Sequence, residues 1–212
     1  MNEQLTKVTY EQEKVGDYIT TATGNKFYIN QPDVEDFNVE DISHALSNIC
    51  RFTGHSPRFY SVGEHSLHCL DIANFLGASP LLCLYALFHD ASEAIMNDLS
   101  RPVKQNLPDY KALEDEISEV MWEVIGVPAP TEEDYKFVKK IDNTLILIEL
   151  VQIMNRGEKD LKEYLHLDTF IPELVTQGYE MDISEGFKSG ESKGVMLEEY
   201  QRLIEVYNEY SL

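Results

Sequence analysis

The sequence predicts an all-α protein with one small β-hairpin near its N-terminus, and three observations support this fold class. Apolar residues recur at helical spacing in a series of segments between residues 39 and 210. These segments are flanked by residues that typically begin or end helices, for example Ser79-Pro80 before the segment at 80–96 and Gly126 after the segment at 109–125. Strand-like sequence is confined to residues 1–31, so the β content should be minor. An apolar share of 43% in 212 residues is enough to form the core of one domain.

In chain order, the hairpin comes first and the helices follow. Tyr18–Thr21 and Lys26–Ile29 flank the turn sequence Ala22–Asn25, and Asp33–Asp36 is an acidic loop. Helices are expected over residues 39–51, 61–76, 80–96, 109–125, 131–154 and 195–210, with two short helices between 161 and 177 separated at Pro172. Within a single domain, residues 1–38 are then a hairpin extension, 39–155 a helical core and 156–212 C-terminal helices.

Several of these helices have a clear signal at their start. Ser61 and Glu64 form a capping-box pattern, and Gly77 ends the helix that they open. Thr131 is an N-cap followed by acidic residues in the first turn, where they interact favourably with the helix dipole. These signals fix where the polar residues of each helix fall relative to its apolar face.

Composition excludes some classes of partner. Lys and Arg total 17 against 38 Asp and Glu, so the net charge is −21. Such a surface repels polyphosphate backbones and anionic lipid, which argues against nucleic acid polymers and membranes but not against a small anion in a local pocket. No apolar run approaches the roughly 20 residues that span a bilayer. Cys50, Cys69 and Cys83 form no CxxC motif and are expected to be free thiols, which suits a cytoplasmic protein.

The segment LLCLYALFHDASE at residues 81–93 is the centre of the functional prediction. Eight apolar residues, Leu81–Phe88, run directly into His89 and Asp90, and leucine and alanine favour a buried helix here. A buried charge costs several kcal/mol unless it is paired or binds a metal. The His-Asp pair at this position therefore indicates a bound cation.

Two further polar residues fall on apolar helix faces. His65 shares its face with Cys69 and Ile72, and Asp142 lies beside the inward residue Ile141. With His89 and Asp90 they form a nitrogen and oxygen donor set that suits Mn²⁺, Fe²⁺, Co²⁺, Ni²⁺ or Zn²⁺ better than Ca²⁺. Such an ion lowers the pKa of a bound water and makes it a nucleophile near neutral pH.

Other charged residues are candidates for catalysis and substrate binding. Glu93 lies one helical turn after His89 and Asp90 and faces the same region, where it could orient a nucleophile. Asp98 is a second candidate for proton transfer, to a leaving oxygen. Arg51, Arg101 and Lys104 are cations in nearby loops that could bind phosphate.

The order His65, His89-Asp90, Asp142 resembles the H…HD…D signature of the HD-domain phosphohydrolases. The segments CRFTGHSPRFYSVGEHS and LFHDASEAIMNDLSRPVKQNLPDY resemble the branch that contains bacterial 5′-deoxynucleotidases and phage dNTP triphosphohydrolases. The resemblance implies an HD-domain helical bundle in which these four residues hold one divalent metal. It also implies that Glu93 and Asp98 are an acidic catalytic pair and that Arg51 lies near the substrate phosphate. The HDxxED box of (p)ppGpp hydrolases and the GYP motif of cyclic-di-GMP phosphodiesterases are both absent.

Several alternatives stay open at this stage. The enzyme could remove one phosphate from a deoxynucleoside monophosphate or release triphosphate from a dNTP, with dATP one candidate, and Mg²⁺ is a candidate second ion. A non-catalytic metal-containing nucleotide-binding or sensor module would keep the metal without turnover, whereas a purely structural helical protein would bind none. The tyrosines of the last helix could face a partner chain, and the resemblance to this branch implies a dimer or a larger assembly. We therefore expect a homo-oligomer.

Overall fold

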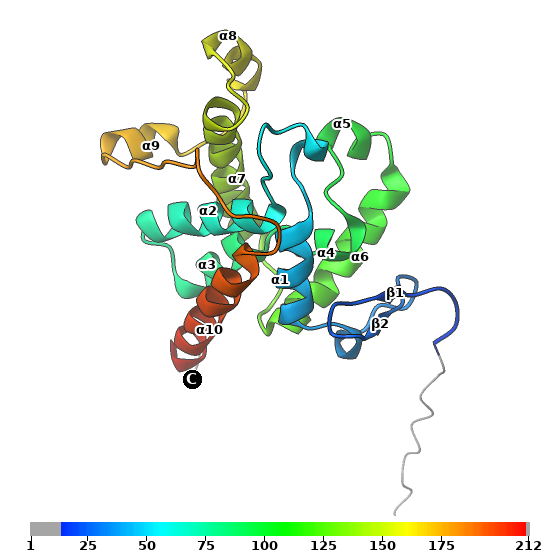
Figure 1. Ribbon diagram of the computed structural model, residues 1–212. Coiled ribbons are helices and arrows are strands. Elements are labelled where there is room, and N and C mark those ends of the chain that lie inside the picture. The colour runs from blue at the N-terminus through cyan, green and yellow to red at the C-terminus, as the bar shows by residue number, and fades with distance from the viewer. Residues whose placement is uncertain (1–13, 211–212) are drawn as a thin grey trace, which may run out of the picture.

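The computed structural model describes residues 14–210, the side chain of Glu158 excepted, and confirms an all-α bundle with a minor β element (Figure 1). Strand β1 (Ile19–Thr20) pairs antiparallel with β2 (Lys26–Phe27), so that Ile19 lies opposite Phe27. This hairpin is the one predicted, although its strands are shorter. The part of the expected β-like segment before residue 14 lies outside the described residues.

The body of the molecule is formed by helices α1 (Val39–Asn48), α2 (Val62–Phe75), α3 (Pro80–Phe88), α7 (Glu132–Gln152) and α10 (Ser192–Tyr210). Helix α2 packs against the other four, and α10 also packs against α1 and α3. The predicted N-caps are present: the side chains of Ser61, Ser79 and Thr131 accept backbone N–H bonds at the starts of α2, α3 and α7. The capping box expected at the start of α2 is not completed, because the Glu64 side chain pairs with Arg58 instead. Because α2 lies at the centre, its polar residues are the ones most enclosed by other helices.

The prediction of one continuous helix over residues 80–96 is wrong. Helix α3 ends at Phe88, a turn follows, and the short helix α4 covers Glu93–Met96. Tight i→i+3 bonds, from Ala91 N to Phe88 O and from Glu93 N to Asp90 O, replace the helical ladder in between. The turn carries His89 and Asp90 out of the buried helix and places them at its end.

The elements around this turn also differ in detail from the prediction. The expected loop at 97–108 contains helix α5 (Arg101–Lys104), and α6 (Pro108–Ile125) follows it. The acidic loop forms a 3-10 turn, η1 (Val34–Asp36), because the Asp33 side chain accepts from the Glu35 backbone N–H. A second 3-10 turn, η2 (Phe52–Gly54), follows α1.

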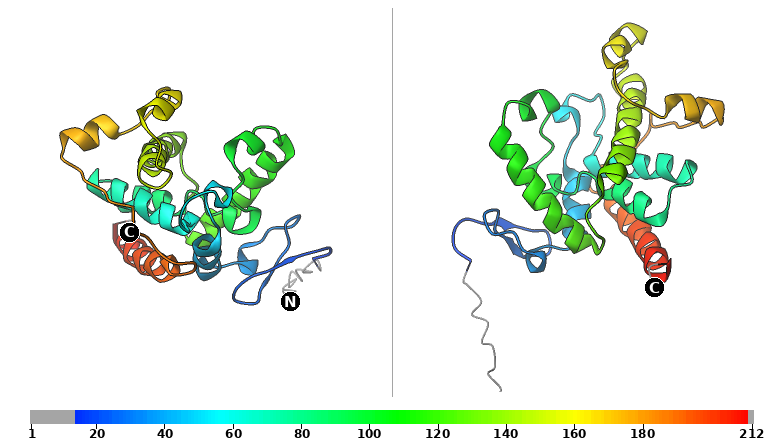
Figure 2. Two further views of the ribbon diagram at one scale, coloured as in Figure 1. Left: turned by 45° about the horizontal axis from the view of Figure 1, so that its top comes forward. Right: turned by 180° about the vertical axis from the view of Figure 1, so that it is seen from behind.

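Beyond α7 the chain forms an arm that projects away from the body (Figures 1 and 2). It contains α8 (Glu158–Leu161), the 3-10 turn η3 (Lys162–Tyr164) and α9 (Ile171–Thr176). The prediction that Pro172 separates two helices is wrong, because Pro172 lies in the first turn of α9, where its missing N–H costs nothing.

The chain returns from the arm to the body and is tied there by hydrogen bonds. Gln152 Nε2 donates to Met181 O and its Oε1 accepts from Ile183 N, at 2.7 and 2.8 Å. Arg58 Nη2 donates to Ile183 O at 2.7 Å. These bonds bring α10 back across the helices that carry the polar cluster described next. None of the helices between residues 14 and 210 is long and apolar enough to cross a bilayer.

Candidate metal centre and its surroundings

Backbone hydrogen bonds join the two ends of the segment between α1 and α2. Arg51 N donates to Tyr60 O at 2.8 Å, and Val62 N donates to Ile49 O at 3.0 Å. The backbone after Arg51 turns through left-handed conformations, with φ of 55° at Phe52 and 52° at Thr53, which non-glycine residues adopt at a cost. This strained, pinned loop holds Arg51 beside the first turns of α2.

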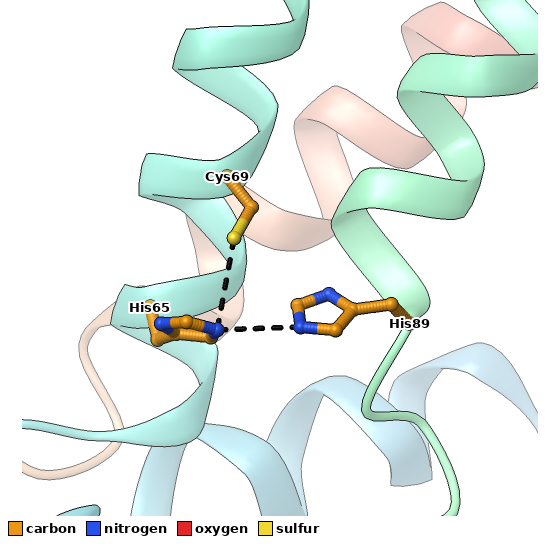
Figure 3. A group of neighbouring side chains, drawn as sticks. All are labelled: His65, Cys69 and His89. Carbon is orange, nitrogen blue, oxygen red and sulfur yellow. Dashed lines mark hydrogen bonds between the residues drawn. The ribbon is translucent and has the colours of Figure 1, made fainter. Parts of the chain in front are cut away.

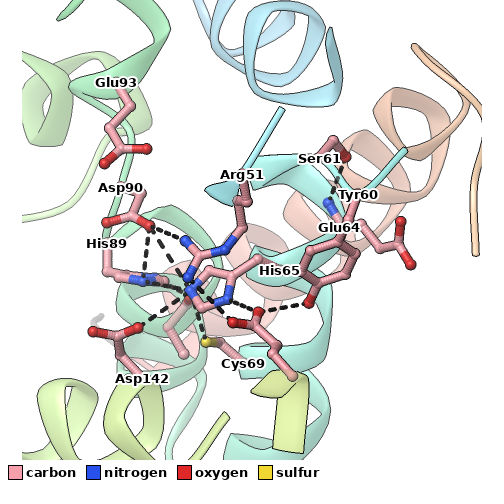
Figure 4. Close-up of polar contacts among 12 residues, drawn as sticks. Arg51, Tyr60, Ser61, Glu64, His65, Cys69, His89, Asp90, Glu93 and Asp142 are labelled. Carbon is pink, nitrogen blue, oxygen red and sulfur yellow. Dashed lines mark hydrogen bonds and ion pairs between the residues drawn. The ribbon is translucent and has the colours of Figure 1, made fainter. Parts of the chain in front are cut away.

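Four donor atoms from three parts of the fold converge beside α2 (Figure 4). His65 Nε2 lies 3.2 Å from His89 Nε2, 3.4 Å from Asp142 Oδ1 and 3.8 Å from Asp90 Oδ2. His89 Nε2 lies 3.2 Å from Asp90 Oδ2. Ligand atoms held at about 2.0–2.2 Å by one first-row divalent ion lie about 3 Å apart. The separations are therefore close to those of a shared ion.

The hydrogen bonds on the far sides of the two imidazoles set their tautomers. His65 Nδ1 lies 2.6 Å from Glu149 Oε1, and His89 Nδ1 lies 2.9 Å from Ala86 O. A carboxylate and a carbonyl only accept, so both Nδ1 atoms carry the proton. In the neutral rings the two Nε2 lone pairs then face each other at 3.2 Å. Such an arrangement is repulsive unless a proton or a metal ion lies between them, and the donor set fits a metal ion.

The two carboxylates of the cluster are held in the ionised form. Burial acts to raise the pKa of Asp90, but the neighbouring His89 and His65 outweigh it and hold the pKa well below its usual range. Burial also acts to raise the pKa of Asp142, but the contact with His65 and the charge of Lys139, 2.5 Å away, outweigh it and hold this pKa well below its usual range. The two carboxylates carry the negative charge that a divalent cation would balance, and the two imidazoles add lone pairs.

Cys69 adds a soft donor to one side of the cluster. Its Sγ lies 3.6 Å from His65 Nε2, and the donor atoms of His65, Cys69 and His89 all lie within 4.8 Å of one another (Figure 3). Burial raises the pKa of the Cys69 thiol well above its usual value, so the thiolate would form only beside a cation. The sequence predicted Cys69 to be a buried free thiol, which is confirmed, but not its closeness to both histidines.

Glu149 is the central residue that the sequence reasoning missed. Its side chain is 0% exposed, and besides His65 it accepts from Tyr60 Oη at 2.7 Å and from Arg51 Nη2 at 3.3 Å. The charge of Arg51 and the bond from His65 lower its pKa against the opposing effect of burial. A signal was available, because Glu149 follows Asp142 by seven residues, two turns along the same face of α7.

Arg51 lies nearer to the cluster than its spacing in the sequence indicated. Its side chain is 12% exposed and bridges Glu149 to Asp90, with Nη1 3.6 Å from Asp90 Oδ2. Its Nε is buried and has no hydrogen-bond partner among the described residues. A buried donor without a partner at the edge of a candidate metal site is available to an anionic ligand.

Glu93 and Asp98 line a cavity of about 490 Å³, together with residues of α1 and of the segment after it. The Glu93 carboxylate points toward Asp90 (Figure 4), and its Oε2 is buried with no partner among the described side chains. Burial raises the pKa of Glu93 well above its usual value, and the charges of Asp90 and Asp98 raise it further. Burial also raises the pKa of Asp98. Both groups can therefore bind and release protons at higher pH than ordinary carboxyls.

Lys104 lies at the outer edge of this region. Its Nζ is 3.7 Å from Glu93 Oε1 but only 2.6 Å from Glu114 Oε1, so Glu114 is its main partner. Arg101 on the same short helix is exposed. The structure thus brings His65, His89, Asp90, Asp142 and Arg51 together, with Glu93 and Asp98 beside them and Lys104 at the periphery.

The chain is similar in sequence to known proteins over about half to two thirds of its length. The chain is 37% identical over 124 residues to the uncharacterized protein YfdR of Escherichia coli, a match that covers 58% of this chain and 67% of YfdR. It is 30% identical over 146 residues to an uncharacterized protein of Rhodobacter capsulatus, covering 65% of this chain and 74% of that one. More distantly, 28% identity over 130 residues relates 49% of this chain to 65% of the 5′-deoxynucleotidase of Citrobacter koseri. No family model matches the chain.

Proposed function

The chain belongs to the family of Escherichia coli YfdR, and we propose that it is a metal-dependent phosphohydrolase that acts on deoxynucleotides. The observation that carries the proposal is the pair of imidazole Nε2 atoms that face each other at 3.2 Å within reach of two ionised carboxylates. The distant similarity to a 5′-deoxynucleotidase supports a nucleotide as the substrate class.

His65, His89, Asp90 and Asp142 would hold the metal, as an HD-type centre in the helical core, and Cys69 is close enough to add a fifth donor. A divalent ion held there would supply Lewis-acid polarisation of a phosphoryl oxygen and activation of water. Mn²⁺, Co²⁺, Zn²⁺, Fe²⁺ and Ni²⁺ all suit mixed imidazole and carboxylate donors, and Mg²⁺ is a candidate second ion.

The surrounding residues supply binding and proton transfer. Arg51, with its unused Nε, would bind a phosphate oxygen beside Asp90, and Lys104 would add positive charge at the outer side. Glu93 would orient the attacking water and accept its proton, which its raised pKa favours. Asp98, whose pKa is also raised, would donate a proton to the leaving oxygen. The cavity beside these two carboxyls would receive the nucleoside.

Two substitutions separate metal binding from catalysis. We expect Asp90→Ala to lose both metal and activity, and Glu93→Gln to keep the metal while turnover falls by about 10²–10⁴-fold, the usual worth of a general base. Glu116→Gln, which removes an exposed carboxylate of α6, is the matched control and should change neither. Elemental analysis measures the metal, and a panel of nucleotides with Mn²⁺, Co²⁺ and Zn²⁺ measures turnover.

The released phosphate distinguishes the two reactions. Orthophosphate from deoxynucleoside monophosphates identifies a 5′-deoxynucleotidase, and tripolyphosphate from a dNTP such as dATP identifies a triphosphohydrolase. An Asp90→Ala protein with undiminished metal and rate would refute the site. A metal-loaded wild type that hydrolyses no nucleotide would refute the function and leave a binding or sensor role.

We also propose three broader features of the protein. The first is the division of the chain into a hairpin extension at 1–38, a metal-binding core at 39–155 and C-terminal helices at 156–212. Assembly into a homo-oligomer is the second. A cytoplasmic location, with small-molecule nucleotides rather than nucleic acid polymers or membranes as partners, is the third.

A further inference from the structure

Glu149 connects both sides of the candidate centre although it is not one of the four donors. Its Oε1 accepts from His65 Nδ1 at 2.6 Å, and its Oε2 lies 3.3 Å from Arg51 Nη2. Arg51 in turn reaches Asp90, so one buried carboxylate touches a proposed ligand directly and another through a single arginine. The Tyr60 hydroxyl holds the same carboxylate from behind at 2.7 Å.

Each contact of Glu149 has a definite consequence for the centre. A carboxylate at His65 Nδ1 keeps the proton on that nitrogen, so the Nε2 lone pair points toward the other donors and cannot be lost to a tautomer change. The same carboxylate offsets the buried charge of Arg51, whose guanidinium would otherwise lack a fully buried anion. The position of Arg51 beside Asp90 therefore depends on Glu149.

We propose that Glu149 is a positioning residue of the centre, which fixes His65 as an Nε2 donor through Oε1 and holds Arg51 at the phosphate side through Oε2. This inference rests on the proposed metal centre but not on the identity of the nucleotide. It predicts two separable defects on substitution: weaker metal binding through His65, and weaker substrate binding through Arg51.

The test begins with Co²⁺ titrated into metal-depleted protein by calorimetry. We expect Glu149→Ala to weaken Co²⁺ binding by about 100-fold and Glu149→Gln by about 10-fold, because the amide oxygen still accepts from His65 while the charge is gone. At saturating Co²⁺, Glu149→Gln should raise the KM for the best nucleotide more than it lowers kcat, since Arg51 loses its anchor.

Glu64 provides a matched control. It is also a fully buried carboxylate, it lies on α2 next to His65, and it is paired bidentately with Arg58 at 2.7 and 3.0 Å. It contacts none of the four donors. Glu64→Gln and Glu149→Gln should therefore both lower the melting temperature, because each removes the buried anion of a largely buried arginine. The Co²⁺ affinity of Glu64→Gln should nevertheless stay within about twofold of wild type. Tyr60→Phe, which removes the rear hydrogen bond alone, should also keep Co²⁺ affinity within about fivefold.

The possible outcomes separate this inference from the function. Equal Co²⁺ affinity in wild type and Glu149→Gln, or equal losses in Glu149→Gln and Glu64→Gln, would overturn the positioning role while the centre stands. If Glu149→Ala does not fold, the Gln variant alone decides. A wild type that binds Co²⁺ but hydrolyses no nucleotide would overturn the proposed function. The positioning role would then be decided by the Co²⁺ affinities of wild type, Glu149→Gln and Glu64→Gln. A wild type that binds no Co²⁺ would overturn both.

Discussion

Glu93 carries a cost to stability that a purely structural residue would not have. Its side chain is 5% exposed, its Oε2 has no partner among the described residues, and its pKa is raised by burial and by the nearby carboxylates. Lys104 Nζ at 3.7 Å offsets little of this, since Glu114 is closer to it. A buried anion so poorly paired is tolerated at sites where its charge or its proton is used.

Because the pKa of Glu93 is raised on folding, its stability contribution is lost as pH rises. The folded protein keeps a proton on Glu93 above the usual value of 4.5, where the unfolded chain has released it, so folding weakens as pH rises toward the folded pKa. We expect Glu93→Gln in metal-free protein to melt about 2–4 °C above wild type near neutral pH, a shift that corresponds to about 1 kcal/mol. The gain should shrink steadily as pH falls toward about 5.

Thermal unfolding in the presence of a chelator measures this difference, with Glu116→Gln as the exposed control that should shift by less than about 1 °C. A melting temperature for Glu93→Gln at or below that of wild type near neutral pH would show that the Glu93 carboxylate is well accommodated in the fold.

At the same scale, the sequence singled out the four residues proposed as metal ligands but not Glu149, which contacts one of them. His65, His89, Asp90 and Asp142 were found because each is a polar residue on an apolar face. Glu149 is also polar, and its side chain is more buried than those of His89, Asp90 and Asp142. The apolar residues around it define the inward face of α7 by themselves, so the pattern does not single out Glu149. The role of this buried carboxylate becomes clear only from its hydrogen bonds to Arg51 and Tyr60, which lie far away in the sequence.

At the scale of elements, helical periodicity located most helices but could not locate the break between α3 and α4. The apolar run and the residues after it satisfy a continuous helical pattern through Met96. The turn is made instead by two i→i+3 bonds around His89–Ser92, which no propensity in that stretch requires. The convergence of His89 and Asp90 on His65 depends on tertiary contacts that override a local preference.

Close packing of α2 against two other helices depends on Gly63. A Cβ at this position would lie 2.8 Å from Ser192 Oγ, 3.0 Å from Met196 Sδ and 3.1 Å from Ser47 N. The backbone nitrogen of α1 cannot move aside as a side chain can. We therefore expect Gly63→Ala to destabilise the protein by about 1–3 kcal/mol, as overpacking typically does.

Gly194 in α10 is the matched comparison, because a Cβ built there has no atom within 4 Å among residues 14–210 apart from its chain neighbours and the backbone of its own helix. Gly194→Ala should stabilise by about 0.5–1 kcal/mol through helix propensity alone. Urea unfolding of both variants measures the two effects, and a neutral or stabilising Gly63→Ala would show that α1, α2 and α10 pack less tightly than these distances indicate.

At the scale of the whole molecule, charge is distributed very unevenly. Of the 17 basic residues, Arg51 and Arg58 are paired with the buried carboxylates Glu149 and Glu64, so neither offsets surface charge. The acidic exterior repels itself, which opposes the compact state. With a divalent ion bound, the proposed site would add positive charge beside Arg51 and could attract a small anion to a chain with net charge −21.

Screening should therefore stabilise the folded protein. The Debye length falls from about 30 Å at 0.01 M salt to about 8 Å at 0.15 M, so repulsion between separated surface carboxylates is lost while the buried pairs around Glu149 are little affected. We expect the melting temperature of the metal-free protein near neutral pH to rise by about 2–4 °C between these two NaCl concentrations, which corresponds to about 1 kcal/mol. Scans at falling pH provide the control, because protonation of surface carboxylates toward the isoelectric point near 4.5 removes the repulsion and the salt effect with it. A melting temperature that falls with added salt near neutral pH would mean that attractive pairs, rather than repulsion among the excess acids, dominate the surface.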